Sequence, residues 1–174
     1  MRKIAIWGVL ALMALAIAAV PALAATNFNN APSGAHYRQG SVEPVCTTST
    51  ANNGTITVSC TGTQIAGVGN TNADLLLTIN AQANFTCSNP GSKDNVVEPH
   101  SGFVTDSTFQ TLEPSRNGTL VVGAKSVSLS PQEAGEQFTC PNTNWTENFV
   151  GFSNVSYTYT LTFDGFDQPA ISLP

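Results

Sequence analysis

Alternation of apolar and polar residues is the dominant pattern of this chain beyond its first 25 residues, and it predicts β-strands. In the segment Ala73–Cys87, most odd-numbered residues are apolar and most even-numbered residues are polar. The expected inward residues are Leu75, Leu77, Ile79, Ala81, Ala83, Phe85 and Cys87. A period of two places them on one face of a strand, which is typical of antiparallel sheets with one dry and one wet face. Because the segment exceeds the usual strand length, we expect a bend or bulge near Ala81 and Ala83.

The segment Asn154–Asp164 alternates in the same way. Its expected inward residues are Val155, Tyr157, Tyr159, Leu161 and Phe163. Weaker patterns predict further strands over 103–112, 119–129 and 145–152, the second of them broken at Gly123. Loops are expected over 88–101 and 130–144, because Pro, Gly and Asn gather there.

About seven strands and no convincing helix place the chain in the all-β class. The favoured architecture is a two-sheet antiparallel sandwich, immunoglobulin-like in architecture, with a closed barrel as the alternative. Immunoglobulin ancestry is not implied. In that fold the core Trp lies between the paired cysteines, whereas Trp145 follows Cys140 here. Residues 166–174 are expected to form a tail or a short edge strand.

The chain has four cysteines, Cys46, Cys60, Cys87 and Cys140. Four cysteines allow three pairings into two disulfides. The segment 46–60 is typical of a hairpin, and a three-residue loop at residues 52–54 would place Cys46 directly opposite Cys60. We therefore predict the disulfides Cys46–Cys60 and Cys87–Cys140. No pair has the Cys-x-x-Cys spacing of zinc or redox sites, so a structural role is favoured.

The N-terminus has the pattern of a secretory signal peptide, which we predict over residues 1–25. Arg2 and Lys3 precede an apolar stretch over 4–20, and small residues at a cleavage site follow Pro21. A retained membrane anchor is the alternative, although the stretch is at the short limit for spanning a bilayer. Residues 26–43 are expected to form a flexible lead-in or an edge strand, and residues 44–174 a single β-sandwich domain. No transmembrane segment is expected in the mature chain.

Composition excludes some partners. Only 10% of the 174 residues are charged, against about 25% in ordinary soluble domains. The 6 Lys and Arg are outnumbered by 11 Asp and Glu. Nucleic-acid binding is therefore not expected, because it needs a cationic surface.

The sequence shows no catalytic constellation, and we predict no enzyme activity, no cofactor and no metal site. The two histidines, His36 and His100, are far apart in the sequence and have no evident catalytic partners. A hydrolase using two carboxylates, with Asp164 or Glu147, is the remaining catalytic alternative. Trp145 is expected in the core, although it could stack on a sugar. The polar Ser and Thr face of the last long strand could bind ice, glycans or another sheet.

Several motifs occur together along the chain. They are AHY at 35–37, CTGTQIAGVGN at 60–70, CSNPG at 87–91 and CPNTNWT at 140–146. With the cysteine hairpin, they resemble a family of small secreted bacterial proteins with the pattern CxG…AGLGN, a CTNPGGN-like loop and CPNPNWT. The chain departs from it at residues 92–94 and at Thr143, where Pro is usual. The resemblance implies export, an all-β domain and paired cysteines, but no catalytic residues, because the family has no established activity.

These observations predict an exported, non-enzymatic β-domain of the cell envelope or extracellular space that acts by binding. Its ligand-binding residues are unknown from the sequence, and its partner would be extracellular, on the cell surface, or another copy of the chain. The alternative is a structural subunit that assembles through strand exchange at sheet edges.

Overall fold

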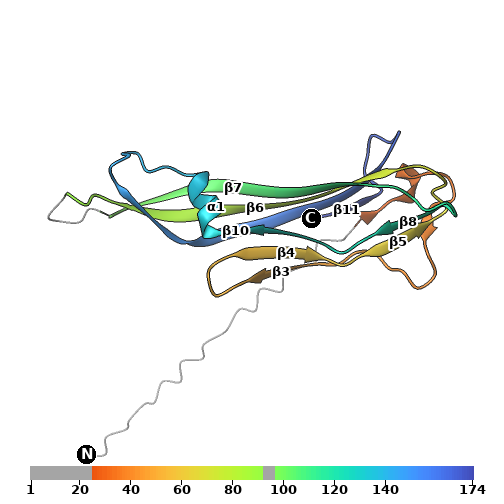
Figure 1. Ribbon diagram of the computed structural model, residues 1–174, viewed down its shortest axis with the longest axis horizontal. Helices are drawn as coiled ribbons and strands as arrows, with labels where there is room; N and C mark the ends of the chain where they lie inside the picture. Colours follow the sequence, from red (N-terminus) through yellow and green to blue (C-terminus); the bar gives the residue numbers. More distant parts are fainter. Residues whose placement is uncertain (1–24, 92–96) are drawn as a thin grey trace, which may run out of the picture.

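The computed structural model describes residues 25–91 and 97–174, and it is built almost entirely of β-strands (Figure 1). The signal peptide predicted over 1–25 lies, except for Ala25, outside the described residues. The described strands are β1 (Ala25–Thr26), β2 (His36–Tyr37), β3 (Cys46–Thr50), β4 (Ile56–Cys60), β5 (Thr63–Ala66), β6 (Ala73–Ser88), β7 (Val97–Leu112), β8 (Thr119–Val122), β9 (Lys125–Leu129), β10 (Thr146–Phe163) and β11 (Ile171–Leu173). Two short helices are η1 (Phe28–Asn30) and α1 (Pro131–Glu136).

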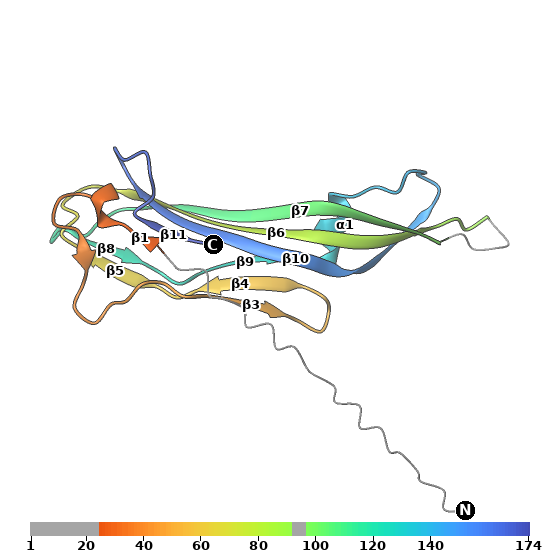
Figure 2. The same ribbon diagram turned by 180° about the vertical axis from the view of Figure 1, so that it is seen from behind.

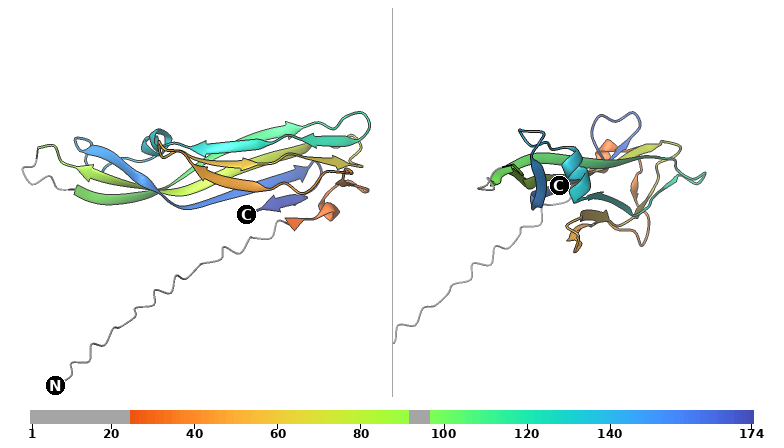
Figure 3. Two further views of the ribbon diagram at one scale, coloured as in Figure 1. Left: turned by 90° about the horizontal axis from the view of Figure 1, so that it is seen from below. Right: turned by 60° about the vertical axis from the view of Figure 1, so that its left-hand side comes forward.

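The largest sheet is antiparallel and has five strands in the order β1-β11-β10-β6-β7. Its three long strands are β6, β7 and β10. The central strand β6 follows its predicted alternation, since every odd-numbered residue from Ala73 to Cys87 is buried. Figure 3 shows that β6, β7 and β10 run nearly the whole length of the molecule.

Two three-stranded sheets, β3-β4-β9 and β2-β5-β8, lie against the same side of the five-stranded sheet (Figures 1 and 2). The two small sheets continue one another in sequence, because β4 leads into β5 and β8 leads into β9. In the hairpin β3-β4, Cys46 pairs directly with Cys60, as predicted. The core forms where the small sheets pack on the large one, around buried residues such as Leu77, Ile65 and Val58.

The described residues form eleven strands in three sheets, whereas about seven strands in a two-sheet sandwich were predicted. Short pairings of two to four residues at the sheet ends account for much of the difference. They include β1, β2 and β11, which come from the segments predicted as lead-in and tail. Such short strands carry too few residues for a period of two to stand out in the sequence.

The helix α1 occupies a segment predicted to be a loop. Its N-cap is Ser130, whose hydroxyl accepts the backbone N–H of Glu133, while the Glu133 carboxylate accepts the backbone N–H of Ser130. Pro131 fits the first helical turn, where its missing N–H costs nothing. The same Ser130 hydroxyl lowers the pKa of Glu133. The sequence contains the Ser-x-x-Glu pattern of this capping box at residues 130–133, but no helix was predicted from it.

The strand β7 begins at Val97, although a loop was predicted over 88–101. Pro99 suggested the loop, because proline cannot donate to a ladder. In the structure β7 is an edge strand, paired with β6 on one side only. The backbone N–H of Thr105 points away from β6, to Gln137. Because backbone groups of an edge strand alternate between the paired and the free side, the nitrogen of Pro99, six residues earlier, also faces the free edge. A proline there removes no ladder hydrogen bond.

The strand β10 is one element of 18 residues where two were predicted. Its pairing with β6 slips twice, between Phe149 and Gly151 and between Ser153 and Ser156. These bulges lie opposite β6 near Ala81 and Ala83, where an irregularity was expected. The first bulge lets Phe149 and Phe152 both pack toward the core despite their spacing of three. At the second, Asn154 has φ +51°, and Val155 is exposed rather than inward as predicted.

Gly67 is required where β5 approaches the lead-in, and a substitution there should destabilise the chain. Its φ is +78°, and a Cβ would clash with the carbonyl oxygen of Gly34. We expect Gly67→Ala to lower the free energy of unfolding by about 3 kcal/mol, since a left-handed backbone costs roughly 1–2 kcal/mol and the clash adds to it. Gly69→Ala is the matched control, because Gly69 has φ +61° but open space around its Cβ. Equal losses in urea unfolding would contradict the clash.

Candidate functional site

The face of the five-stranded sheet that points away from the small sheets is polar along three long strands, and we call it the outer face. The strand register shows which residues belong to this face, because directly paired residues on neighbouring strands point to the same side of the sheet. From β7 it takes Ser101, Phe103, Thr105, Ser107, Phe109 and Thr111; from β6, Asp74, Leu76, Thr78, Asn80, Gln82, Asn84 and Thr86; and from β10, Ser153, Ser156, Thr158, Thr160 and Thr162. Among these residues only Asp74 is ionisable, and it accepts a hydrogen bond from the Thr111 hydroxyl at 2.7 Å.

Two phenylalanines stand out from this polar surface. Phe103 is 82% exposed and Phe109 is 61% exposed. Phe109 pairs across the ladder with the half-exposed Leu76, whereas Phe103 pairs with Gln82. Six residues along one strand separate the two rings by about 20 Å, with Thr105 and Ser107 between them on the same face. The outer face therefore presents two separate aromatic rings on a polar, nearly uncharged floor.

Polar side chains near Phe103 are held in place by bonds across the strands. Gln82 donates to the Ser101 hydroxyl at 2.8 Å and accepts from the amide of Asn154 at 2.7 Å. Asn84 donates to the Ser153 hydroxyl at 3.0 Å and to the Gly151 carbonyl at 3.3 Å. The bulges of β10 bring Ser153 and Asn154 into this reach. The amides are thus preorganised, which lowers the entropy lost on binding.

A shallow pocket of about 270 Å³ opens beside Phe103 at the far end of the outer face. It is lined by Asn84, Phe85, Thr86, Pro99, His100, Ser101 and Val150. Val150 is 65% exposed because the first bulge of β10 turns it outward. The pocket is therefore made by the first part of β7, which was predicted to be a loop, and by the first bulge of β10.

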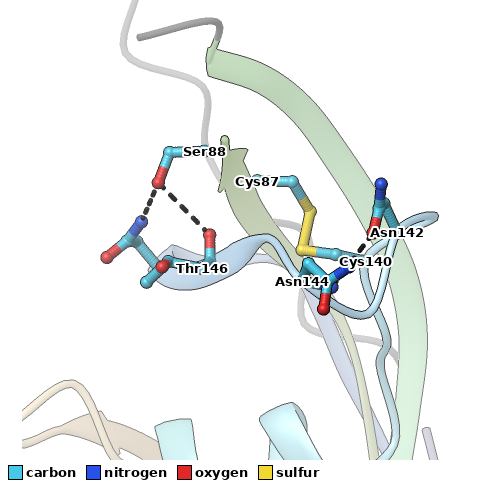
Figure 4. Close-up of a disulfide and its surroundings, with 7 residues drawn as sticks. Cys87, Ser88, Cys140, Asn142, Asn144 and Thr146 are labelled. Atoms are coloured by element: carbon cyan, nitrogen blue, oxygen red, sulfur yellow. Dashed lines mark hydrogen bonds between the residues drawn. A yellow bond between two sulfur atoms is a disulfide. The ribbon is translucent and has the colours of Figure 1, made fainter. Parts of the chain in front are cut away.

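The disulfide Cys87–Cys140 secures the same end of the sheet from the inner side (Figure 4). It joins the end of β6 to the segment before β10. Next to it, the Ser88 hydroxyl bonds with the Thr146 carbonyl at 3.4 Å, and the Asn144 backbone N–H donates to the Asn142 side chain at 3.0 Å. The disulfides Cys46–Cys60 and Cys87–Cys140 are both the predicted pairs, and the part of the chain that the structure describes has no free cysteine.

The residues considered for catalysis do not come together. Glu147 lies near the start of β10 and Asp164 directly after its end, so that at about 3.3 Å per residue they are separated by roughly 55 Å. A pair of glycosidase carboxylates lies within about 10 Å. Burial raises the pKa of Glu147, without a second carboxylate as a cause. His36 is in β2 and His100 in β7.

No group of three or more potential metal ligands occurs within residues 25–91 and 97–174. Burial also raises the pKa of Tyr159 in the core to about 12. A second pocket, of about 280 Å³, lies beside β5 and β8, next to residues 40–42. It is lined by Gly40, Ser41, Val42, Gly62, Thr63, Gln64, Val121 and Val122, which include no ionisable side chain.

Comparison of the chain with sequence models of known protein families, with curated proteins and with solved structures finds no match. Among the described helices, none has the length and apolar character needed to cross a membrane.

Sequence reasoning named no ligand-binding residue and missed Phe103 and Phe109. Their even spacing of six shows that both lie on one face of a strand. The sequence of β7 has apolar residues on both faces, however, since Val104 and Leu112 alternate with the two phenylalanines. Only the pairing with β6 shows that Phe103 and Phe109 face outward.

Proposed function

We propose that this chain is an exported, non-enzymatic β-domain of the cell envelope or extracellular space that binds its partner through the outer face. The observation that carries the proposal is the pair of exposed rings, Phe103 and Phe109, on a rigid and nearly uncharged sheet. Aromatic residues, Phe included, are enriched in binding interfaces relative to the rest of the protein surface. Two disulfides support an oxidising compartment, where such bonds persist.

The architecture that goes with this proposal is a two-layer, immunoglobulin-like sandwich. The register supports it, because β4-β9 and β5-β8 can be joined without a shift: Cys60 pairs with Lys125 and Thr63 pairs with Val122. The two small sheets then act as one interrupted layer opposite the five-stranded sheet. This arrangement leaves the outer face uncovered along its full length.

The test is retention of the oxidised mature chain on envelope and extracellular material from the cells that produce it. The variant F103T/F109T removes both rings and keeps residues that favour strands. Val121→Thr is the matched control, because Val121 is 56% exposed but lies in β8, away from the outer face. We expect the double variant to lose retention and the control to keep it. Equal retention of all three proteins would overturn the proposal.

Assembly through strand exchange is the second candidate, and the free edge of β7 favours it. An edge strand of 16 residues offers unpaired backbone groups to another chain. One site on this edge is closed: the Gln137 side chain accepts from the Thr105 N–H at 3.2 Å and donates to the Thr105 carbonyl at 3.3 Å. Gln137 therefore occupies the place of an added strand at the middle of β7.

Removing this amide should promote self-association. We expect the molar mass of Gln137→Ala to grow with concentration in light scattering, while the wild-type chain stays near the mass of one chain. Gln132→Ala is the control, since Gln132 is exposed on α1, which Gln137 directly follows, and its side chain bonds to Glu136 within that helix. Growth of the wild-type mass itself would instead favour strand exchange as the function. A constant mass for Gln137→Ala would show that the amide does not guard the edge.

A further inference from the structure

We infer that the partner of the outer face is a neutral polysaccharide, which lies along β7 with sugar rings against Phe103 and Phe109. This inference rests on the proposed binding function and names its ligand class. It follows from three properties of the face: its charge, the spacing of its rings and its polar groups.

The charge of the outer face excludes ionic partners. Asp74 is the only ionisable residue among the outward residues of β6, β7 and β10, and it accepts a hydrogen bond from the Thr111 hydroxyl. The adjoining pocket adds one imidazole, that of His100. Nucleic acid and anionic lipid need clustered cations, and none lies on this face. A cationic polymer needs clustered carboxylates, which are also absent from it. A surface with so few charged groups is best suited to an uncharged ligand.

The spacing of the rings argues against a protein or a bilayer as the partner. Protein interfaces bind mainly through a central cluster of packed anchors, and amphipathic membrane contacts need a continuous apolar surface. Phe103 and Phe109 are about 20 Å apart along β7, with hydroxyl side chains between them. A long, repetitive ligand can contact both rings at once. A polysaccharide does so because its pyranose rings present apolar C–H faces at regular intervals.

The polar groups of the face match the remaining surface of a sugar chain. Sugar hydroxyls both donate and accept hydrogen bonds, as do Ser and Thr hydroxyls and Asn and Gln amides. Gln82 and Asn84 are held by neighbouring side chains beside Phe103. The pocket of about 270 Å³ next to them is slightly below the usual range of small-molecule sites, about 300–1,000 Å³. It has room for one ring or a branch of a longer chain.

The experiment measures binding of the oxidised mature chain to defined polymers. The probes are insoluble cellulose and chitin by co-sedimentation, and soluble xylan, mannan and mixed-linkage glucan by affinity electrophoresis. Alginate, anionic lipid vesicles and ice are the comparison surfaces. We expect binding to at least one neutral polysaccharide, no binding to the comparison surfaces, and little dependence on salt. F103T/F109T should bind at least about tenfold more weakly than the wild type, and Val121→Thr should bind like the wild type.

A third variant separates sugar recognition from general adsorption to apolar surfaces. Gln82→Leu replaces a central amide by an apolar side chain of similar size. Sugar binding should fall, because hydroxyl partners are lost, whereas adsorption to apolar material should rise. Stronger binding of Gln82→Leu to the polysaccharide would overturn the inference. Circular dichroism and urea unfolding verify that each variant is folded.

The outcome also distinguishes this inference from the proposed function. The ligand class is wrong if the chain binds none of the neutral polysaccharides but is retained on envelope material in a way that F103T/F109T abolishes. Retention that resists glycosidases and is lost after protease treatment of that material would then point to a protein partner. Both proposals are wrong if F103T/F109T and the wild-type chain bind every surface equally.

Discussion

Removing the Cys87–Cys140 disulfide is expected to lower the free energy of unfolding by about 4 kcal/mol, because the bond closes a long loop in the unfolded chain. The cysteines are 53 residues apart in sequence, and both are buried. The bond also holds the segment before β10 against the end of β6, and this segment carries Phe138 onto the core. The variant C87A/C140A should therefore unfold at a clearly lower urea concentration than the oxidised wild type.

The other disulfide supplies the control. Cys46 and Cys60 are 14 residues apart, so chain entropy gives about 3 kcal/mol for C46A/C60A. These cysteines already face one another across a paired hairpin, and no distant segment depends on their bond. Reduced wild-type protein should be less stable than either variant. A smaller loss for C87A/C140A than for C46A/C60A would contradict the role of the long loop.

Phe85→Ala is expected to cost about 4 kcal/mol, within the range of roughly 3–5 kcal/mol for a buried phenylalanine. Phe85 is 1% exposed. Its ring stacks on Phe138 with centroids 4.3 Å apart and meets the edge of Phe149 at 5.6 Å. These rings cover the end of the five-stranded sheet, which extends beyond the small sheets (Figure 1). The alanine would leave a cavity that this small cluster cannot refill.

Phe103→Ala is the matched control, since it is the same change on the opposite face of the same sheet. Phe103 is 82% exposed, so the loss should stay within about 0.5 kcal/mol. Urea unfolding followed by circular dichroism measures both variants. Similar losses for the two would mean that the outer face is packed in solution. A cycle combining Phe85→Ala with C87A/C140A should show coupling, because Phe138 and Cys140 belong to one segment.

Local pattern was enough to predict several features of the fold. The alternation over Ala73–Cys87 predicted the buried face of β6, since a period of two needs no knowledge of neighbours. The three-residue loop at 52–54 predicted the register of β3 and β4, and with it the pairing of Cys46 and Cys60. The break at Gly123 predicted the division between β8 and β9.

Features that depend on neighbouring strands were predicted poorly. Pro99 indicated a loop, and only the position of β7 at a sheet edge makes it compatible with a strand. The bulges of β10 arise from its pairing with β6, and they decide that Phe152 packs inward while Val150 and Val155 are exposed. The capping box at Ser130 is a different case, because its signal was local and was missed.

The sequence by itself determined the all-β class, the dry face of β6 and the cysteine pairing, because local alternation and loop length carry that information. The even spacing of Phe103 and Phe109, which was overlooked in the sequence, also places both on one face of a strand. The tertiary structure alone decided that this face points to solvent, through the register of β7 on β6. It also decided that amides from β6 and β10 meet beside Phe103. These amide contacts join residues 67 to 72 positions apart, and no local pattern specifies their pairing.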